Sequence, residues 1–150
     1  MKNYLSILNK LILMLLAFLG FSCDPNEPGV EYGMPCADFK VNGNVVDEIS
    51  LEKISNIQVV LQNALSSTIH GDTAYSDENG NYEVSLNDFP GSNAFIVNFK
   101  DVDGTRNGSY LATDTIIDFS DIEFTDGDGS WYSGEKSKEL NIKLSPDEAL

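Results

Sequence analysis

The closely spaced oxygen donors that begin at Asp101 are the side chains best suited to bind a metal ion. Asp101, Asp103 and Asn107 alternate with glycines that allow the chain to bend. Calcium takes about six to eight oxygen ligands, and an EF-hand loop supplies some of them from its fifth and twelfth positions. Here those positions hold Thr105 and Ala112, so only half of the loop is matched. The residues predict either a calcium site or, as we favour, a polar turn that uses Asp and Gly for its geometry.

Trp131 and Tyr132 form an aromatic pair in a glycine-rich segment. Such rings offer flat apolar area with a polar edge, which suits a sugar or a partner chain. The alternative, which we favour, is that they pack against one end of the domain. A ligand platform at Trp131 and Tyr132 is therefore the second candidate site.

The residue types that catalysis requires are scarce or scattered. His70 is the only histidine, which excludes a multi-histidine metal centre and leaves any catalytic triad dependent on this residue. No Gly-x-Ser-x-Gly motif occurs. Acidic pairs such as Asp77 and Glu78 lie in predicted turns, where carboxylates are normally solvated. We expect no enzymatic activity and, calcium aside, no cofactor.

Two threonines lie in an Asp-Thr-apolar pattern that resembles the O-glycosylation motif of the Bacteroidetes. They are Thr73, within residues 72–74, and Thr115, within residues 114–116. Glycosylation would require both side chains to be exposed.

The segments that must position these residues alternate apolar and polar side chains with a period of two. Ile57, Val59 and Leu61 are one example, and this period is typical of half-buried strands. Turn signals, such as residues 77–80, separate the apolar runs. The expected strands are residues 39–46, 57–62, 73–76, 82–86, 95–99, 110–119 and 140–144. Short strands at this spacing predict an all-β fold, a Greek-key β-sandwich of about seven strands, with residues 127–134 as a loop.

The first residues of the chain have the pattern of a secretory leader. Lys2 and Lys10 precede an apolar run over residues 11–21. A signal peptide has an apolar core of about 7–15 residues, whereas a membrane span needs roughly 20. The run ends at Cys23, with small residues before it, as in a lipoprotein signal. We predict a signal peptide over residues 1–22, a lipid anchor on Cys23, an acidic tether over residues 23–34, a sandwich over residues 35–146 and a tail over residues 147–150.

Cys36 is the second of two cysteines. If Cys23 carries a lipid, Cys36 is a lone thiol that behaves as a small hydrophobe. The alternative is ordinary cleavage of the leader and a disulfide between the two in an oxidising compartment.

The charge balance restricts the partners. The chain has 24 acidic residues against nine lysines and arginines, a net charge of −15. Such a surface repels nucleic acids and anionic headgroups. We expect contact with a membrane through the lipid anchor alone, and a location in the cell envelope. Acids close behind Cys23 resemble the signal that exports lipoproteins to the cell surface, although they also suit a solvated linker.

Three segments resemble the carboxypeptidase-regulatory-like, transthyretin-like sandwich: Lys40–Asp47, Ile54–Leu61 and Asp72–Val84. More narrowly, the mature chain is similar to the radical SAM-associated lipoproteins of the Bacteroidetes. That similarity rests on Glu31–Pro35, on Asp101–Gly104 with Asn107 and Gly108, and on Trp131 and Tyr132 with Gly134 and Glu135. It implies an outer-membrane lipoprotein that is the partner or substrate of a radical SAM enzyme, and it supplies no catalytic residue.

Three functions follow from these observations. The first is a non-enzymatic envelope lipoprotein that serves a radical SAM enzyme system. The second is a calcium- or carbohydrate-binding module at the cell surface. The third is a fimbrial or structural subunit that joins its neighbours by strand addition.

Overall fold

A computed structural model describes Lys10, residues 33–65 and residues 71–147. The predicted signal peptide (apart from Lys10), Cys23, most of the tether, and His70 lie outside the described residues. The sandwich belongs to a compact unit, Gly33–Leu150. Within the described ranges, no helix has the length and hydrophobicity needed to cross a membrane.

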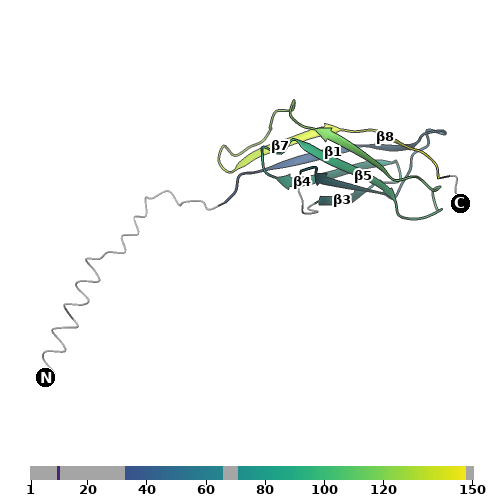
Figure 1. Ribbon diagram of the computed structural model, residues 1–150, viewed down its shortest axis with the longest axis horizontal. Helices are drawn as coiled ribbons and strands as arrows, with labels where there is room; N and C mark the ends of the chain where they lie inside the picture. The colour runs from purple at the N-terminus through teal and green to yellow at the C-terminus, as the bar shows by residue number, and fades with distance from the viewer. Residues whose placement is uncertain (1–9, 11–32, 66–70, 148–150) are drawn as a thin grey trace, which may run out of the picture. The chain divides into compact units, whose positions relative to one another are not determined.

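The described part of the domain consists of strands joined by turns and loops (Figure 1). The strands are β1 (Cys36–Asp47), β2 (Ile57–Asn63), β3 (Gly71–Tyr75), β4 (Asn81–Asp88), β5 (Ala94–Asp101), β6 (Thr113–Asp118), β7 (Tyr132–Glu139) and β8 (Ile142–Leu144). The predicted all-β sandwich is confirmed, with eight strands where the sequence led us to expect about seven.

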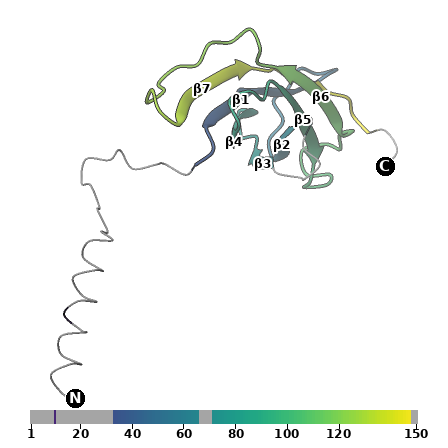
Figure 2. The same ribbon diagram turned by 60° about the vertical axis from the view of Figure 1, so that its left-hand side comes forward.

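The strands form two sheets that pack face to face (Figures 1 and 2). In the first sheet the order is β4-β1-β7, and β8 also pairs with β1. β1 is antiparallel to β4 but parallel to both β7 and β8. The second sheet has the order β3-β2-β5-β6 and is antiparallel throughout.

The period-two alternation explains the core, because successive side chains of a strand point to opposite faces of its sheet. Along β1, Phe39 and Val41 are fully buried while Lys40 between them is partly exposed. The rings of Phe39 and Phe95, one from each sheet, lie 4.6 Å apart. Phe119 packs edge-on against both. Aromatic contacts of this kind join the two sheets.

β7 is the strand that the sequence did not predict. Its first residue, Tyr132, falls in the segment that we expected to be a loop, and only Gly134 and Lys136 within it are buried. Gly134 has a φ of 109°, and a Cβ there would lie 2.1 Å from the carbonyl oxygen of Thr125. A polar strand of this kind shows no apolar alternation, so only its pairing with β1 identifies it.

The chain leaves the β1 ladder between β7 and β8 and passes very close to β1. Leu140 donates its N–H to the carbonyl oxygen of Asn42 at 2.8 Å, and its own carbonyl accepts from the Tyr82 hydroxyl at 2.7 Å. A Cβ on Gly43 would lie 1.9 Å from that carbonyl oxygen. Glycine at residue 43 therefore allows the close approach.

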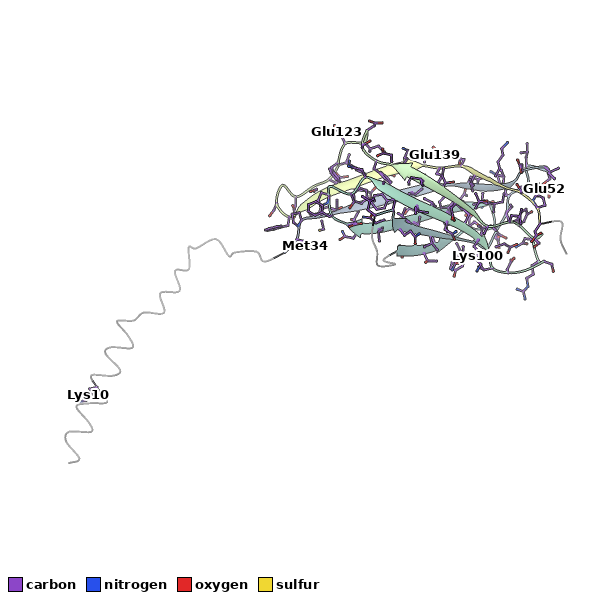
Figure 3. The ribbon with its side chains drawn as sticks, viewed as in Figure 1. Lys10, Met34, Glu52, Lys100, Glu123 and Glu139 are labelled. Carbon is purple, nitrogen blue, oxygen red and sulfur yellow. The ribbon has the colours of Figure 1, made fainter. Side chains whose placement is uncertain are left out.

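The surface is acidic, as the composition requires. The side chains of Glu52, Glu123 and Glu139 are exposed and project from separate parts of the sandwich (Figure 3). Lys40 forms an ion pair with Glu135 at 3.0 Å on the outer side of the first sheet.

Candidate functional site

The predicted calcium residues lie together at the end of β5, in a network of hydrogen bonds. The Asp101 carboxylate accepts from the N–H groups of Asp103 at 3.2 Å and Tyr110 at 3.1 Å. The Asp103 carboxylate accepts from the amide nitrogens of Asn107 at 2.9 Å and Asn56 at 3.3 Å. An amide nitrogen is a donor and cannot ligate a cation. Among the described residues, no three His, Cys, Asp or Glu side chains are grouped to hold a metal ion. The arrangement is that of a hydrogen-bonded polar loop.

The aromatic pair is divided between two environments. Trp131 is 37% exposed, whereas Tyr132 begins β7 and is half-buried. The Tyr132 hydroxyl donates to the Asp38 carboxylate at 2.9 Å, and this bond raises the pKa of Tyr132 to about 12. Only Trp131 therefore presents ring surface that is not already committed to the fold.

The two threonines also differ. Thr73 is exposed on β3, at the end of its sheet. Thr115 is half-buried, because it faces inward opposite the buried Val97 of β5. Thr73 alone meets the exposure that the O-glycosylation motif requires. Cys36 is a free, half-buried thiol at the start of β1.

A surface that the sequence did not reveal lies along β6, which ends the second sheet and, among the described strands, pairs with β5 only. Phe119, just after β6, donates its N–H to the carbonyl oxygen of Asn93 at 2.9 Å. In an antiparallel pair, residues alternate between those that bond to the neighbouring strand and those that point away from it. Counting back from Phe119, Asp114 and Ile116 direct their backbone groups away from β5.

The side chains on this edge form an apolar centre between two acids. Ile116 is 73% exposed and lies opposite the half-buried Ile96 of β5. Asp114 and Asp118 are exposed on either side of it. Ser120 donates its N–H to the Asp118 carboxylate at 2.7 Å, which lowers the pKa of Asp118 and keeps it charged. We call these four residues (Ile96, Asp114, Ile116 and Asp118) the β6 edge surface.

The C-terminal end of β6 is fastened to the other sheet. Lys138 of β7 donates to the carbonyl oxygen of Asp118 at 2.6 Å, and Lys136 donates to that of Phe119 at 2.9 Å. The outer edge of β7 is itself covered near its start, since Thr125 exchanges two backbone hydrogen bonds with Glu135. Residues 113–117 have no comparable covering segment in the part of the chain that the structure describes.

The composition of β6 suits the addition of another strand. Thr and Ile have high β-propensity, and residues 113–117 include neither proline nor lysine, the residues with which proteins commonly protect exposed edges. An extended polypeptide can therefore bond to the free backbone groups and cover Ile116.

No protein-family model matches the chain, and no curated protein sequence matches it. Among solved structures, it is similar to BcpA, the major pilin subunit of Bacillus cereus, with a TM-score of 0.43 and 15% identity over 74% of this chain and 31% of that one. It is also similar to the C-terminal domain of the shaft pilin of Lactobacillus rhamnosus GG, with a TM-score of 0.39 and 14% identity over 73% of this chain and 98% of that one. GBS52, the minor pilin of Streptococcus agalactiae, gives a TM-score of 0.39 and 8% identity over 78% of this chain and 47% of that one. At these values the likeness does not bear on function, and the fold is established by the strand pairing described above.

Proposed function

We propose that this protein is a non-enzymatic structural module of the cell envelope, which binds an extended segment of another envelope protein along β6. The observation that carries the proposal is the edge at Asp114 and Ile116, which no described strand pairs and which has a large apolar side chain exposed at its centre.

Strand addition at this edge has a favourable energy. The N–H and C=O groups of Asp114 and Ile116 are available for hydrogen bonds, each worth about 0.5–1.5 kcal/mol net. Covering Ile116 contributes up to about 1.5–3 kcal/mol from the removal of apolar surface from water. These terms together suit reversible binding, and side chains outside the edge would add specificity.

Charge indicates the chemistry of the partner. A strand laid beside β6 places its outward side chains next to Asp114, Ile116 and Asp118. The best match is a segment with an apolar residue between two lysines or arginines, each two positions away. A second copy of the chain fits poorly: antiparallel pairing centred on Ile116 sets Asp114 of each copy opposite Asp118 of the other, and like charges in that position are destabilising.

The proposed location in the cell envelope depends on the predicted signal peptide and lipid anchor. Lipidation of Cys23 would hold the domain at a membrane and keep β6 within reach of other envelope proteins, among them the substrate or partner proteins of a radical SAM system. Replacing Cys23→Ala should release the protein from the membrane fraction, because each buried methylene of an acyl chain contributes about 0.8 kcal/mol to anchoring.

Site-specific photocrosslinking in cells that express the full chain tests the proposal. A photoreactive amino acid replaces Ile116 in one variant and Ile49 in the other, two isoleucines that are 73% and 74% exposed. We expect an adduct from residue 116 alone, mapped to an extended, basic-flanked apolar segment of another protein. Equal adducts from both positions, or an adduct with a second copy, would overturn it.

A backbone substitution provides the second test. The Ile116 N–H points away from β5, so Ile116→Pro removes a donor from the free edge and leaves the β5 pairing in place. The crosslink, now introduced at Asp114, should weaken by about tenfold or more, which corresponds to about 1.4 kcal/mol. Thermal unfolding of the same variant checks that the domain is folded.

A further inference from the structure

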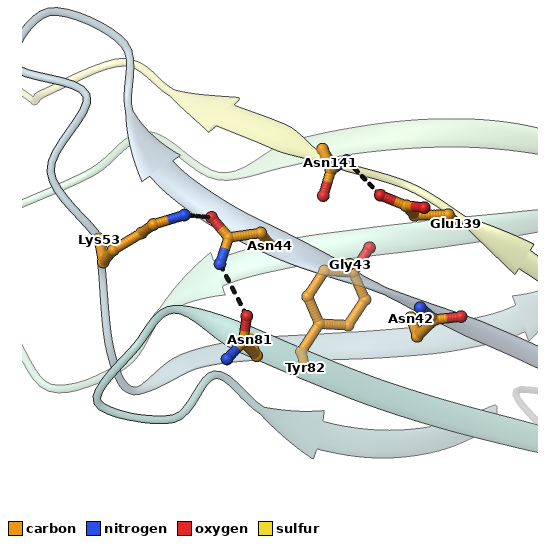
Figure 4. A pocket seen from close by; sticks show the side chains of 8 residues that line it. All are labelled: Asn42, Gly43, Asn44, Lys53, Asn81, Tyr82, Glu139 and Asn141. Carbon is orange, nitrogen blue, oxygen red and sulfur yellow. Dashed lines mark hydrogen bonds between the residues drawn. The ribbon is translucent and has the colours of Figure 1, made fainter.

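We infer that an amide-lined pocket on the first sheet binds an uncharged polyhydroxylated ligand such as a short glycan. The pocket has a volume of about 500 Å³ and lies where the chain passes from β7 to β8 (Figure 4). Its lining residues are Asn42, Gly43, Asn44, Lys53, Asn81, Tyr82, Glu139 and Asn141.

One wall of the pocket is held in place by its own hydrogen bonds. Asn44 accepts from the Lys53 ammonium and donates to the Asn81 side-chain oxygen at 3.0 Å. The same amide nitrogen also donates to the carbonyl oxygen of Asn79 at 3.0 Å. Three side chains from separate segments are thereby fixed before any ligand arrives, which reduces the entropy lost on binding.

The opposite wall offers further side-chain groups that can form hydrogen bonds with a ligand. Asn141 donates to Glu139 at 2.7 Å, and the side-chain oxygen of Asn141 can still accept a hydrogen bond. The half-buried Asn42 amide has no hydrogen-bond partner within residues 33–65 and 71–147. The ring of Tyr82 is 4% exposed and packs edge-on against Phe99 in the core. Its hydroxyl is already bonded to Leu140, so the polar recognition comes from the surrounding amides.

The lining selects the class of ligand. A carboxamide carries both a donor and an acceptor, and hydroxyl groups on adjacent ring carbons match that combination. Glu139 and the net charge of −15 disfavour an anion, and the polar lining disfavours an apolar molecule. The pocket volume accommodates one or two sugar rings. This site contains neither Trp131 nor Tyr132, and it lies on the sheet opposite β6, so it is independent of both surfaces discussed above.

Nuclear magnetic resonance of the full chain in detergent, with ¹⁵N-labelled asparagine, tests the inference. The probes are glucose, galactose, N-acetylglucosamine, lactose and chitobiose, each titrated separately. With at least one sugar, we expect saturable shifts in the side-chain signals of Asn42, Asn44, Asn81 and Asn141. The matched controls are Asn63 and Asn98, whose amides lie on the second sheet and outside the pocket.

Substitution at Asn42 completes the test. Because this amide has no hydrogen-bond partner among the described residues, Asn42→Ala and the nearly isosteric Asn42→Asp should leave the fold intact. Asn42→Ala should weaken binding about tenfold, the effect of losing one or two hydrogen bonds. The inference is overturned if none of the five sugars shifts the pocket signals, if the control amides shift equally, or if affinity is unchanged in both variants. A negative result in the sugar titrations would not change the crosslink that is expected from residue 116, so the two proposals can fail separately.

Discussion

The outer faces of the two sheets differ although their inner faces are built alike. Most outward positions of the first sheet are polar, with Cys36, Val46 and Tyr132 as exceptions: Asp38, Lys40, Asn42, Asn44, Asn81, Glu83, Ser85, Asn87, Glu135, Ser137 and Glu139. Outward positions of the second sheet include apolar and aromatic side chains: Val60, Tyr75, Ile96 and Ile116. The core requires only the inward half of each strand, so the outward half can differ in composition between the two sheets.

On the outer face of the first sheet, polar side chains hold one another in position. Asp38 accepts from both Tyr132 and Asn87, the latter at 2.8 Å, and Lys40 pairs with Glu135. Exposed ion pairs contribute little to stability, so this network sets side-chain positions more than it stabilises the fold. It also gives the amide pocket a pre-arranged polar surrounding.

Truncating side chains of the shared core should lower stability most, because both sheets pack against this core. Phe39→Ala and Phe95→Ala each delete a fully buried ring and should lower the free energy of unfolding by about 3–5 kcal/mol. The control is Phe89→Ala, which truncates a ring that is 52% exposed and should change stability by about 0.5 kcal/mol or less. Urea denaturation measures all three. If Phe39→Ala cost no more than Phe89→Ala, the two sheets would not share this core.

Replacing the lysines that link the two sheets should lower stability by an intermediate amount. Lys136 is 6% exposed, and its ammonium lies 4.6 Å from the centre of the Phe124 ring. Lys136→Met keeps the apolar stem but leaves the Phe119 carbonyl without its donor, at a cost of about 1–3 kcal/mol. Lys138→Met removes a more exposed bond and should cost about 0.5–1 kcal/mol. Stability is measured by chemical denaturation. Equal losses of stability in the two variants would show that the burial of Lys136 does not strengthen the contribution of its hydrogen bond.

The smallest expected effect is on the ionisation of one side chain, Tyr132, on the outer face of the first sheet. The pKa of Tyr132 is raised from an ordinary 10.0 to about 12, so the bond to Asp38 stabilises the fold below pH 10 and is lost as the pH rises through about 12. Asp38→Asn should move this pKa back towards 10.0, and Asp114→Asn on the other sheet should not. Tyrosinate absorbance, with Tyr132→Phe to assign the transition, measures both. An unchanged pKa in Asp38→Asn would contradict the proposed cause.

Much of the fold could be predicted from the alternation of residues such as Ile57, Val59 and Leu61, because a buried inner face imposes that period directly. β7 could not be, since its inward positions hold Gly134, Lys136 and Lys138 rather than apolar side chains. The β6 edge was equally hidden: residues 113–118 alternate as an internal strand does, and only the sheet order shows that no described strand pairs with the outer side of β6.

The amide pocket was hidden for another reason. Its asparagines come from three separate segments, around residues 42, 81 and 141, and asparagine is ordinarily read as a turn residue. The donors at Asp101, Asp103 and Asn107 are close in sequence and do meet in space, but their bonds to one another follow from backbone geometry that the spacing does not specify.

The parallel pairing of β1 with β7 and β8 has a consequence for biogenesis. β1 is the first strand to be synthesised, yet one side of it is completed only by the last two strands, and contacts between distant parts of a chain form slowly. If the chain is exported N-terminus first, as the predicted signal peptide would require, β1 emerges with one side unpaired, and the first sheet is completed only when β7 and β8 follow.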